Sequence, residues 1–107
     1  TDDIRNSSTI DLVKDLLNVH EVHGHDPIVS QNVLESLNVV PATIEDGFKN
    51  ADCVIITNNH KFYEKLDITS LLKKSSNPCL FVDCWRLFDK KVFQDNKSII
   101  YSGIGVD

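Results

Sequence analysis

Apolar positions along the chain change their period several times, and each change predicts a new element. Residues 10–17 repeat at helical spacing behind the hydroxyls of Ser7 and Ser8, which predicts an opening helix. Residues 52–57 (DCVIIT) and 78–83 (PCLFVD) are instead continuous apolar runs. Such runs are expected of parallel strands covered on both faces.

Shorter elements are predicted between and after these runs. They are a strand at 21–25, helices at 31–38 and 43–50, an extended segment at 39–41, helical turns at 61–66 and 88–93, a helix capped by Asp67, and a closing strand at 98–102. Strands separated by helices predict an α/β, Rossmann-like domain in three layers with a mainly parallel sheet. Ligands of such sheets bind near the carboxyl ends of the strands. We expect residues 1–107 to form one domain.

Composition narrows the choice of partners. Eleven Lys+Arg against sixteen Asp+Glu give a net charge of -5, which argues against a general nucleic-acid surface. No apolar run is long enough to cross a bilayer, and no segment resembles a signal peptide, so we expect a cytoplasmic protein without a membrane partner. A small anionic ligand needs only one or two positive groups and is compatible with this charge.

Few motifs in the chain indicate catalysis or metal binding. Cys53, Cys79 and Cys84 are odd in number and lack CxxC spacing, so they predict neither a disulfide framework nor a zinc site. The histidines within 20–25 lack a partner ligand at metal spacing and fit a solvent-facing strand end. GxGxxG, P-loop and GxSxG motifs are absent from the sequence. We therefore predict no catalytic residue, metal site or cofactor site in this chain.

Polar residues follow two of the predicted buried strands, at 57–60 (TNNH) and 83–86 (DCWR). Trp85 offers a flat apolar face to a base, and Arg86 offers a fork that matches phosphate. Alternatively, Trp85 covers the sheet edge and Arg86 pairs with a nearby acid. The residue pattern alone leaves both interpretations open.

Two further residues are candidate ligand contacts. His60 follows a strand end and either contacts a ligand or is a hydrogen-bonded loop residue. Arg5 lies just before the first predicted helix and either contacts an anion or forms an ion pair at the helix start.

Several segments, in order, resemble the UDP-binding C-terminal domain of the nucleotide-sugar 6-dehydrogenases, the UDP-glucose/GDP-mannose dehydrogenase family. They are 1–8 (family TDDxRxS), Asp26-Pro27 (family DP), 51–57 (an AD-x-hydrophobic-T strand), 81–83 (a strand ending in Asp) and 98–105 (a strand with G-x-G). The matches span nearly the whole chain. The TNNH and DCW strand ends are more similar to the branch acting on N-acetylated sugars, such as UDP-N-acetylmannosamine dehydrogenase. Glucose-type enzymes tend to carry Thr-Glu-Trp and Asp-Gly-Arg there.

The resemblance implies a UDP-sugar ligand and an NAD-dependent, two-step oxidation of a sugar C6 hydroxymethyl to a carboxylate. The catalytic cysteine and the NAD site are implied to lie in the N-terminal and central domains. This chain is then an inactive partner of those domains in a homo-oligomeric enzyme. The implied UDP contacts are Arg5, His60, Asp83, Trp85 and Arg86, with Trp85 where glucose-type enzymes have an arginine. A first strand is expected upstream, so the sheet is truncated and exposes an edge.

We consider three alternatives to this function. Within the family, the alternatives are a UDP-glucose or a UDP-N-acetylglucosamine 6-dehydrogenase. A non-catalytic α/β interaction module would leave the fluorescence of Trp85 indifferent to UDP. A free-standing small enzyme would need an acidic cluster or a reactive cysteine that this sequence lacks.

Overall fold

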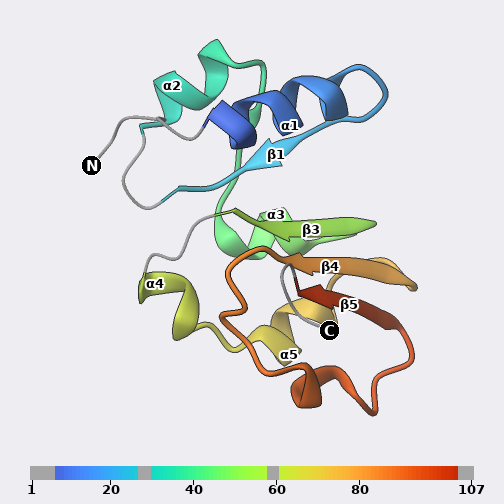
Figure 1. Cartoon of the computed structure of the whole chain (residues 1–107). Helices are drawn as coiled ribbons and strands as arrows, with labels where there is room; N and C mark the ends of the chain where they lie inside the picture. Colours follow the sequence, from blue (N-terminus) through green and yellow to red (C-terminus); the bar gives the residue numbers. More distant parts are fainter. Residues whose placement is uncertain (1–6, 27–29, 58–60, 104–107) are drawn as a thin grey trace. The chain divides into compact units, whose positions relative to one another are not determined.

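The computed structural model describes residues 7–26, 30–57 and 61–103, and the chain divides into two compact units, Thr1–Gly47 and Phe48–Asp107. Each unit has its own parallel sheet (Figure 1). The predicted mixed α/β fold with parallel strands is therefore confirmed. None of the described helices is long and apolar enough to cross a membrane.

The N-terminal unit is a small βαβ arrangement preceded by a helix. Its elements are α1 (Ser7–Leu17), β1 (His23–Gly24), α2 (Gln31–Ser36) and β2 (Val40–Pro41). β1 and β2 run parallel, with His23 opposite Val40 and Gly24 opposite Pro41. Parallel strands need a crossover connection, and α2 provides it. The hydroxyl of Ser30 caps this helix by accepting a hydrogen bond from the N–H of Val33 at 3.4 Å.

Gly24 of β1 packs closely against side chains of its own unit. A Cβ at this position would lie 2.6 Å from Cγ1 of Val39 and 3.6 Å from Cδ2 of Leu34. Val39 is buried, and its β-branched side chain has little freedom to move aside. Close packing therefore requires glycine at this position.

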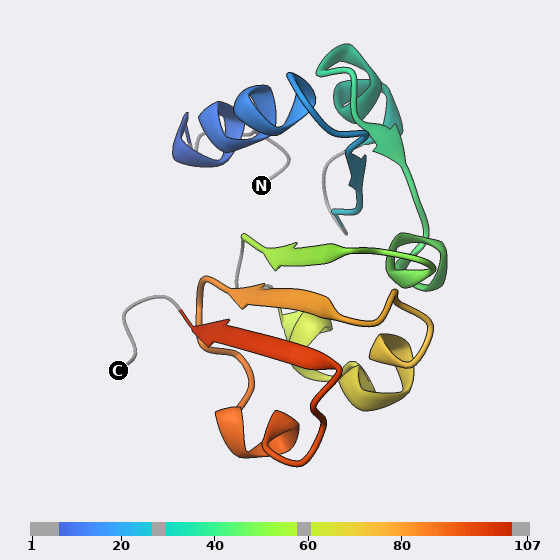
Figure 2. The same cartoon turned by 90° about the vertical axis from the view of Figure 1, so that its right-hand side faces the viewer.

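The C-terminal unit carries the larger sheet. Its elements are β3 (Cys53–Ile56), α4 (Lys61–Glu64), α5 (Ile68–Leu72), β4 (Cys79–Asp83), the 3₁₀ helix η1 (Lys90–Phe93) and β5 (Ile99–Gly103), while α3 (Ile44–Phe48) precedes them across the unit boundary. The strands are parallel in the order β3-β4-β5 (Figure 2). Asp67 caps α5 as predicted, because its carboxylate accepts hydrogen bonds from Ser70 and Thr69.

β4 is covered on one face only among the described residues. Cys79, Phe81 and Asp83 on one face are wholly buried, whereas Leu80 on the other is 38% exposed. Ile100, which pairs with Leu80 from β5, is 56% exposed. Right-handed crossovers between strands taken in the order β3, β4, β5 put both connections on the same face. Among the residues that the structure describes in this unit, the connections therefore cover one face and leave the other partly exposed.

Four aromatic rings form the core on the covered face. The ring of Phe81 lies 6.0 Å from Phe88, 5.4 Å from Phe93 and 6.0 Å from Tyr101, measured between centroids. Phe93 and Tyr101 stack at 4.7 Å with 15° between their planes. Phe93 belongs to η1 and Tyr101 to β5. The cluster therefore packs the segment between β4 and β5 against the covered face of the sheet.

Candidate functional site

The candidate site lies at the carboxyl ends of β3 and β4. Ile56 of β3 pairs with Asp83 of β4, so the residues that follow the two strands emerge side by side. The indole Nε1–H of Trp85 donates a hydrogen bond to the carbonyl oxygen of Thr57, at 2.9 Å. The structure thus joins the two polar strand ends that the sequence singled out.

Trp85 combines a fixed polar end with an open ring. Its N–H is satisfied by Thr57, yet the side chain is 50% exposed. An indole held in this way presents a rigid apolar face to solvent, which suits stacking against a planar ring. Of the two interpretations left open by the sequence, the exposed platform fits this geometry better than a residue that covers the sheet edge.

Asp83 is wholly buried beneath this loop, and both its carboxylate oxygens accept hydrogen bonds. Oδ1 accepts from the backbone N–H of Trp85 at 3.3 Å and of Leu87 at 3.0 Å. Oδ2 accepts from the backbone N–H of Phe88 at 2.9 Å and from the hydroxyl of Tyr101 at 3.1 Å. The geometry shows Asp83 engaged with its own loop, and its direct contact with a ligand stays a prediction.

Arg86 follows Trp85 in the loop after β4. Its side chain is exposed, and its backbone φ is 52°, in the left-handed region that residues with a Cβ rarely adopt. Among the described residues, Arg86 forms no ion pair, so the alternative of a pairing with a nearby acid has no support there. An exposed guanidinium has the fork of donors that suits an anion.

Tyr101 is a component of the site that the sequence did not single out. Its hydroxyl lies 3.0 Å from the carbonyl oxygen of Phe88 as well as 3.1 Å from Asp83. Burial, followed by the charge and the hydrogen bond of Asp83, raises the pKa of Tyr101 from 10.0 to about 12. The hydroxyl therefore keeps its proton and donates at neutral pH. In the sequence, only its position pointed to this residue. Tyr101 lies two residues after Ile99, and alternate residues of a strand share a face, which here is the covered face of β5.

The remaining candidates separate into two groups. Arg5 and His60 lie outside the described residues, and their predicted contacts stay predictions. Burial is the first cause that raises the thiol pKa of all three cysteines, Cys53, Cys79 and Cys84, so they are weak nucleophiles near neutral pH. Within the described residues, no group of three or more His, Cys, Asp or Glu side chains could hold a metal ion.

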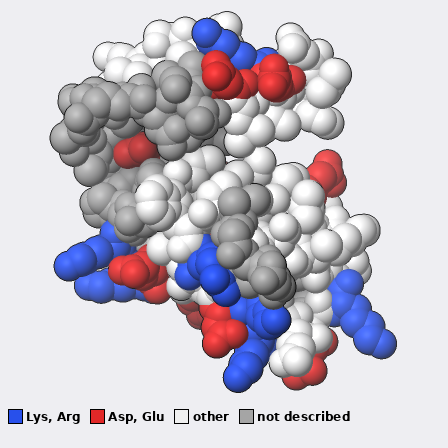
Figure 3. Space-filling view, in the orientation of Figure 1, with Lys and Arg blue, Asp and Glu red and all other residues white. Residues whose placement is uncertain are grey.

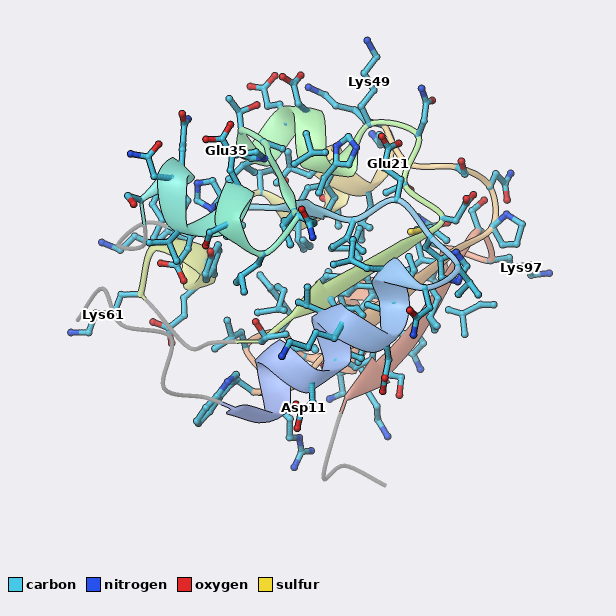
Figure 4. The ribbon with its side chains drawn as sticks, turned by 90° about the horizontal axis from the view of Figure 1, so that it is seen from above. Asp11, Glu21, Glu35, Lys49, Lys61 and Lys97 are labelled. Carbon is cyan, nitrogen blue, oxygen red and sulfur yellow. The ribbon has the colours of Figure 1, made fainter. Side chains whose placement is uncertain are left out.

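Charge divides unevenly between the two units. Residues 1–47 carry two Lys+Arg and nine Asp+Glu, a net charge of -7, while residues 48–107 carry nine and seven, a net of +2. Figure 3 shows Lys and Arg side chains spread among acidic ones on the visible surface. Figure 4 labels acidic examples, Asp11, Glu21 and Glu35, and basic ones, Lys49, Lys61 and Lys97. The strand ends with Trp85 and Arg86 belong to the unit whose net charge is positive.

Parallel strands whose carboxyl ends present an exposed aromatic ring and an exposed guanidinium suit the binding of a nucleotide by an α/β domain. Residues 1–90 match the family model for the UDP-glucose/GDP-mannose dehydrogenase family, UDP binding domain, and the chain belongs to this family. The comparison with curated proteins gave no match. The chain is therefore a UDP-binding domain of the nucleotide-sugar dehydrogenases, a family of enzymes that use NAD.

Proposed function

We propose that this chain binds the UDP portion of a UDP-sugar within an NAD-dependent 6-dehydrogenase, using the loop after β4. The observation that carries the proposal is the half-exposed indole of Trp85, pinned to Thr57 at the carboxyl ends of two parallel strands. Ligands of open parallel sheets bind at this end, and a nucleotide supplies the planar ring that the indole suits.

Each exposed side chain of the loop has a distinct part in this proposal. The face of Trp85 stacks against the uracil, and the guanidinium of Arg86 binds the diphosphate. Arg86 thereby takes over the nucleotide contact that an arginine at the position of Trp85 makes in glucose-type relatives. Arg5 and His60 are proposed as additional UDP contacts.

The oxidation itself is assigned to other parts of the enzyme. An NAD site of the Rossmann type needs a glycine-rich turn between a strand and a helix, and this sequence has no GxGxxG. The residues of this chain therefore do not fit NAD. We propose that the chain acts with the N-terminal and central domains of a cytoplasmic homo-oligomer, and that it is inactive alone.

For the sugar, we propose an N-acetylated UDP-hexosamine, with UDP-N-acetylmannosamine as the first substrate to test. The support is the sequence of the two strand ends, TNNH and DCW, in place of the Thr-Glu-Trp and Asp-Gly-Arg of glucose-type enzymes. UDP-N-acetylglucosamine and UDP-glucose are the alternatives. Turnover of the three sugars by the full-length enzyme, compared side by side, distinguishes them.

A non-catalytic interaction module is the second candidate function. The observation that favours it is the exposed apolar face of the larger sheet, which includes Leu80 and Ile100. Such a module would bind a protein through this face, and UDP would leave the emission of Trp85 unchanged.

Calorimetric titration of the chain with UDP and with uridine tests the proposal. We expect weak binding of both ligands, with UDP tighter, and a change in Trp85 fluorescence that follows the same isotherm. Arg86→Ala should weaken UDP about tenfold while leaving uridine nearly unaffected, since a hydrogen-bonded charge contributes about 1.5–3 kcal/mol. Lys97→Ala removes the same charge just before β5, at the opposite end of the sheet, and should change neither affinity. Absence of heat and of a fluorescence change at millimolar UDP would contradict the proposal.

A further inference from the structure

The carboxylate of Asp83 organises the loop that presents Trp85 and Arg86. Three of the four backbone N–H groups from Trp85 to Phe88 point at its two oxygens, at distances of 2.9–3.3 Å. The fourth, that of Arg86, donates instead to the main-chain carbonyl of Asp83 at 3.4 Å. The whole turn is therefore wrapped around one residue.

This wrapping determines the direction in which the loop side chains point. Between the bonds to Trp85 and Leu87 the backbone must reverse, and it does so through the left-handed conformation of Arg86. An arginine in this conformation is unfavourable unless the surrounding contacts impose it. The hydrogen bonds to the carboxylate are contacts of this kind, and they leave the side chains of Trp85 and Arg86 outside.

Tyr101 holds the carboxylate itself in place. Its hydroxyl lies within hydrogen-bond distance of both Oδ2 of Asp83 and the carbonyl oxygen of Phe88, so it joins the two ends of the turn. Its ring stacks on Phe93 and lies beside Phe81, which fixes the hydroxyl relative to the sheet.

In place of the direct UDP contact predicted from the sequence, we propose that Asp83 is a positioning residue of the UDP site, acting with Tyr101 through Trp85 and Arg86. The buried carboxylate acts on the ligand indirectly, because it fixes the backbone of the loop that carries Trp85 and Arg86. This inference rests on the proposed UDP function, but its structural part concerns the loop alone.

The single tryptophan provides a measurement that is independent of UDP. Asp83→Asn keeps the shape of the side chain but places an amide NH₂ against two of the four donors. We expect greater quenching of Trp85 by acrylamide and a shifted emission maximum, with an unchanged far-UV circular dichroism spectrum. Ile68→Val is the matched control, because it loosens the buried face of α5 and leaves the loop contacts intact. Trp85 emission identical to that of the wild type in folded Asp83→Asn would overturn the proposal.

A double-mutant cycle in UDP affinity separates positioning from direct contact. Alone, Asp83→Asn should weaken UDP about tenfold, the scale of one hydrogen bond to a charged group. In an Arg86→Ala background the same change should cost clearly less, because part of what Asp83 positions is already gone. An undiminished loss, together with unaltered Trp85 emission, would assign Asp83 a direct contact and overturn the proposal.

Tyr101→Phe keeps the test decisive if Asp83→Asn does not fold. It removes one donor to Asp83 while retaining the stack on Phe93, and we expect a smaller change in the same direction in both measurements. No change in either measurement would overturn the proposal. If wild-type chain binds no UDP, the proposed function fails, and acrylamide quenching of the variants still decides whether Asp83 positions the loop.

Discussion

The indole nitrogen of Trp85 and the carbonyl oxygen of Thr57 lie 2.9 Å apart, and their hydrogen bond joins the ends of two neighbouring strands. The bond satisfies the polar atom of the indole without burying its ring, which is 50% exposed. A residue of this kind contributes separately to stability through its N–H and to ligand binding through its face.

Replacement of Trp85 by Phe should separate these two contributions. Phe keeps an aromatic face but loses the donor to Thr57, so the free energy of unfolding should fall by about 1 kcal/mol, the net value of one hydrogen bond. UDP affinity should fall less with Phe than with Ala. Urea unfolding followed by circular dichroism and calorimetric titration measure the two effects. Equal UDP affinities of the Phe and Ala variants would contradict stacking by this side chain.

Two glycines should respond to alanine in opposite directions. Gly24→Ala places a Cβ 2.6 Å from Cγ1 of buried Val39, and we expect a loss of about 1–3 kcal/mol of stability from overpacking. At Gly47, within α3, a Cβ meets nothing within 4 Å, so Gly47→Ala should add about 0.5–1 kcal/mol. Urea midpoints of the two variants give the comparison. Equal shifts of the same sign would show that the packing against Val39 is not what requires glycine.

Arg86→Gly should separate the backbone of this position from its side chain. Glycine adopts a φ of 52° at little steric cost, so stability should stay unchanged or rise by up to about 1 kcal/mol. UDP affinity should nevertheless fall as it does in Arg86→Ala. Thermal unfolding and calorimetry measure the two quantities. A stability loss above that of Arg86→Ala would indicate that the left-handed conformation is not under strain.

Alkaline pH should destabilise the chain through Tyr101. Burial and then Asp83 raise the pKa of Tyr101 from 10.0 to about 12, so the folded protein keeps a proton that the unfolded chain releases. The contribution of this group is intact below pH 10 and is lost as the pH rises from about 10 to about 12. Unfolding midpoints in urea should fall across this window, and more steeply than in Tyr101→Phe. The difference in tyrosinate absorbance at 295 nm between the two proteins should titrate near pH 12, and a midpoint near 10 would contradict the shift.

The order and type of the elements follow from the sequence to a large extent. Continuous apolar runs at 52–57 and 78–83 became β3 and β4, and the cap at Asp67 opens α5 as predicted. These features are local, because hydrophobic period and capping depend on neighbours within a few residues. Most predicted elements were longer than the observed ones, as with β1, which keeps two of the residues predicted for 21–25, whereas the closing strand predicted at 98–102 has the same length as β5.

The site was predictable only in part. Trp85 and Arg86 were found because two polar segments follow buried strands, and parallel strands align their carboxyl ends. Tyr101 was missed because it lies 18 residues from Asp83, and the register of β4 and β5 brings the two together. Arg5 and His60 lie outside the described residues, so their contacts stay predictions.

By itself, the sequence determined an α/β chain with parallel strands, its family, and the loop that carries the exposed aromatic and basic residues. Tertiary structure alone decided that Asp83 is buried and bonded to that loop, that Trp85 is pinned to Thr57, and that Leu80 and Ile100 on one face of the larger sheet are exposed. The physical reason is range. Helices, caps and strand runs arise from neighbouring residues, whereas the burial of Asp83, its bond from Tyr101 and the bond of Trp85 to Thr57 depend on register between strands distant in the chain.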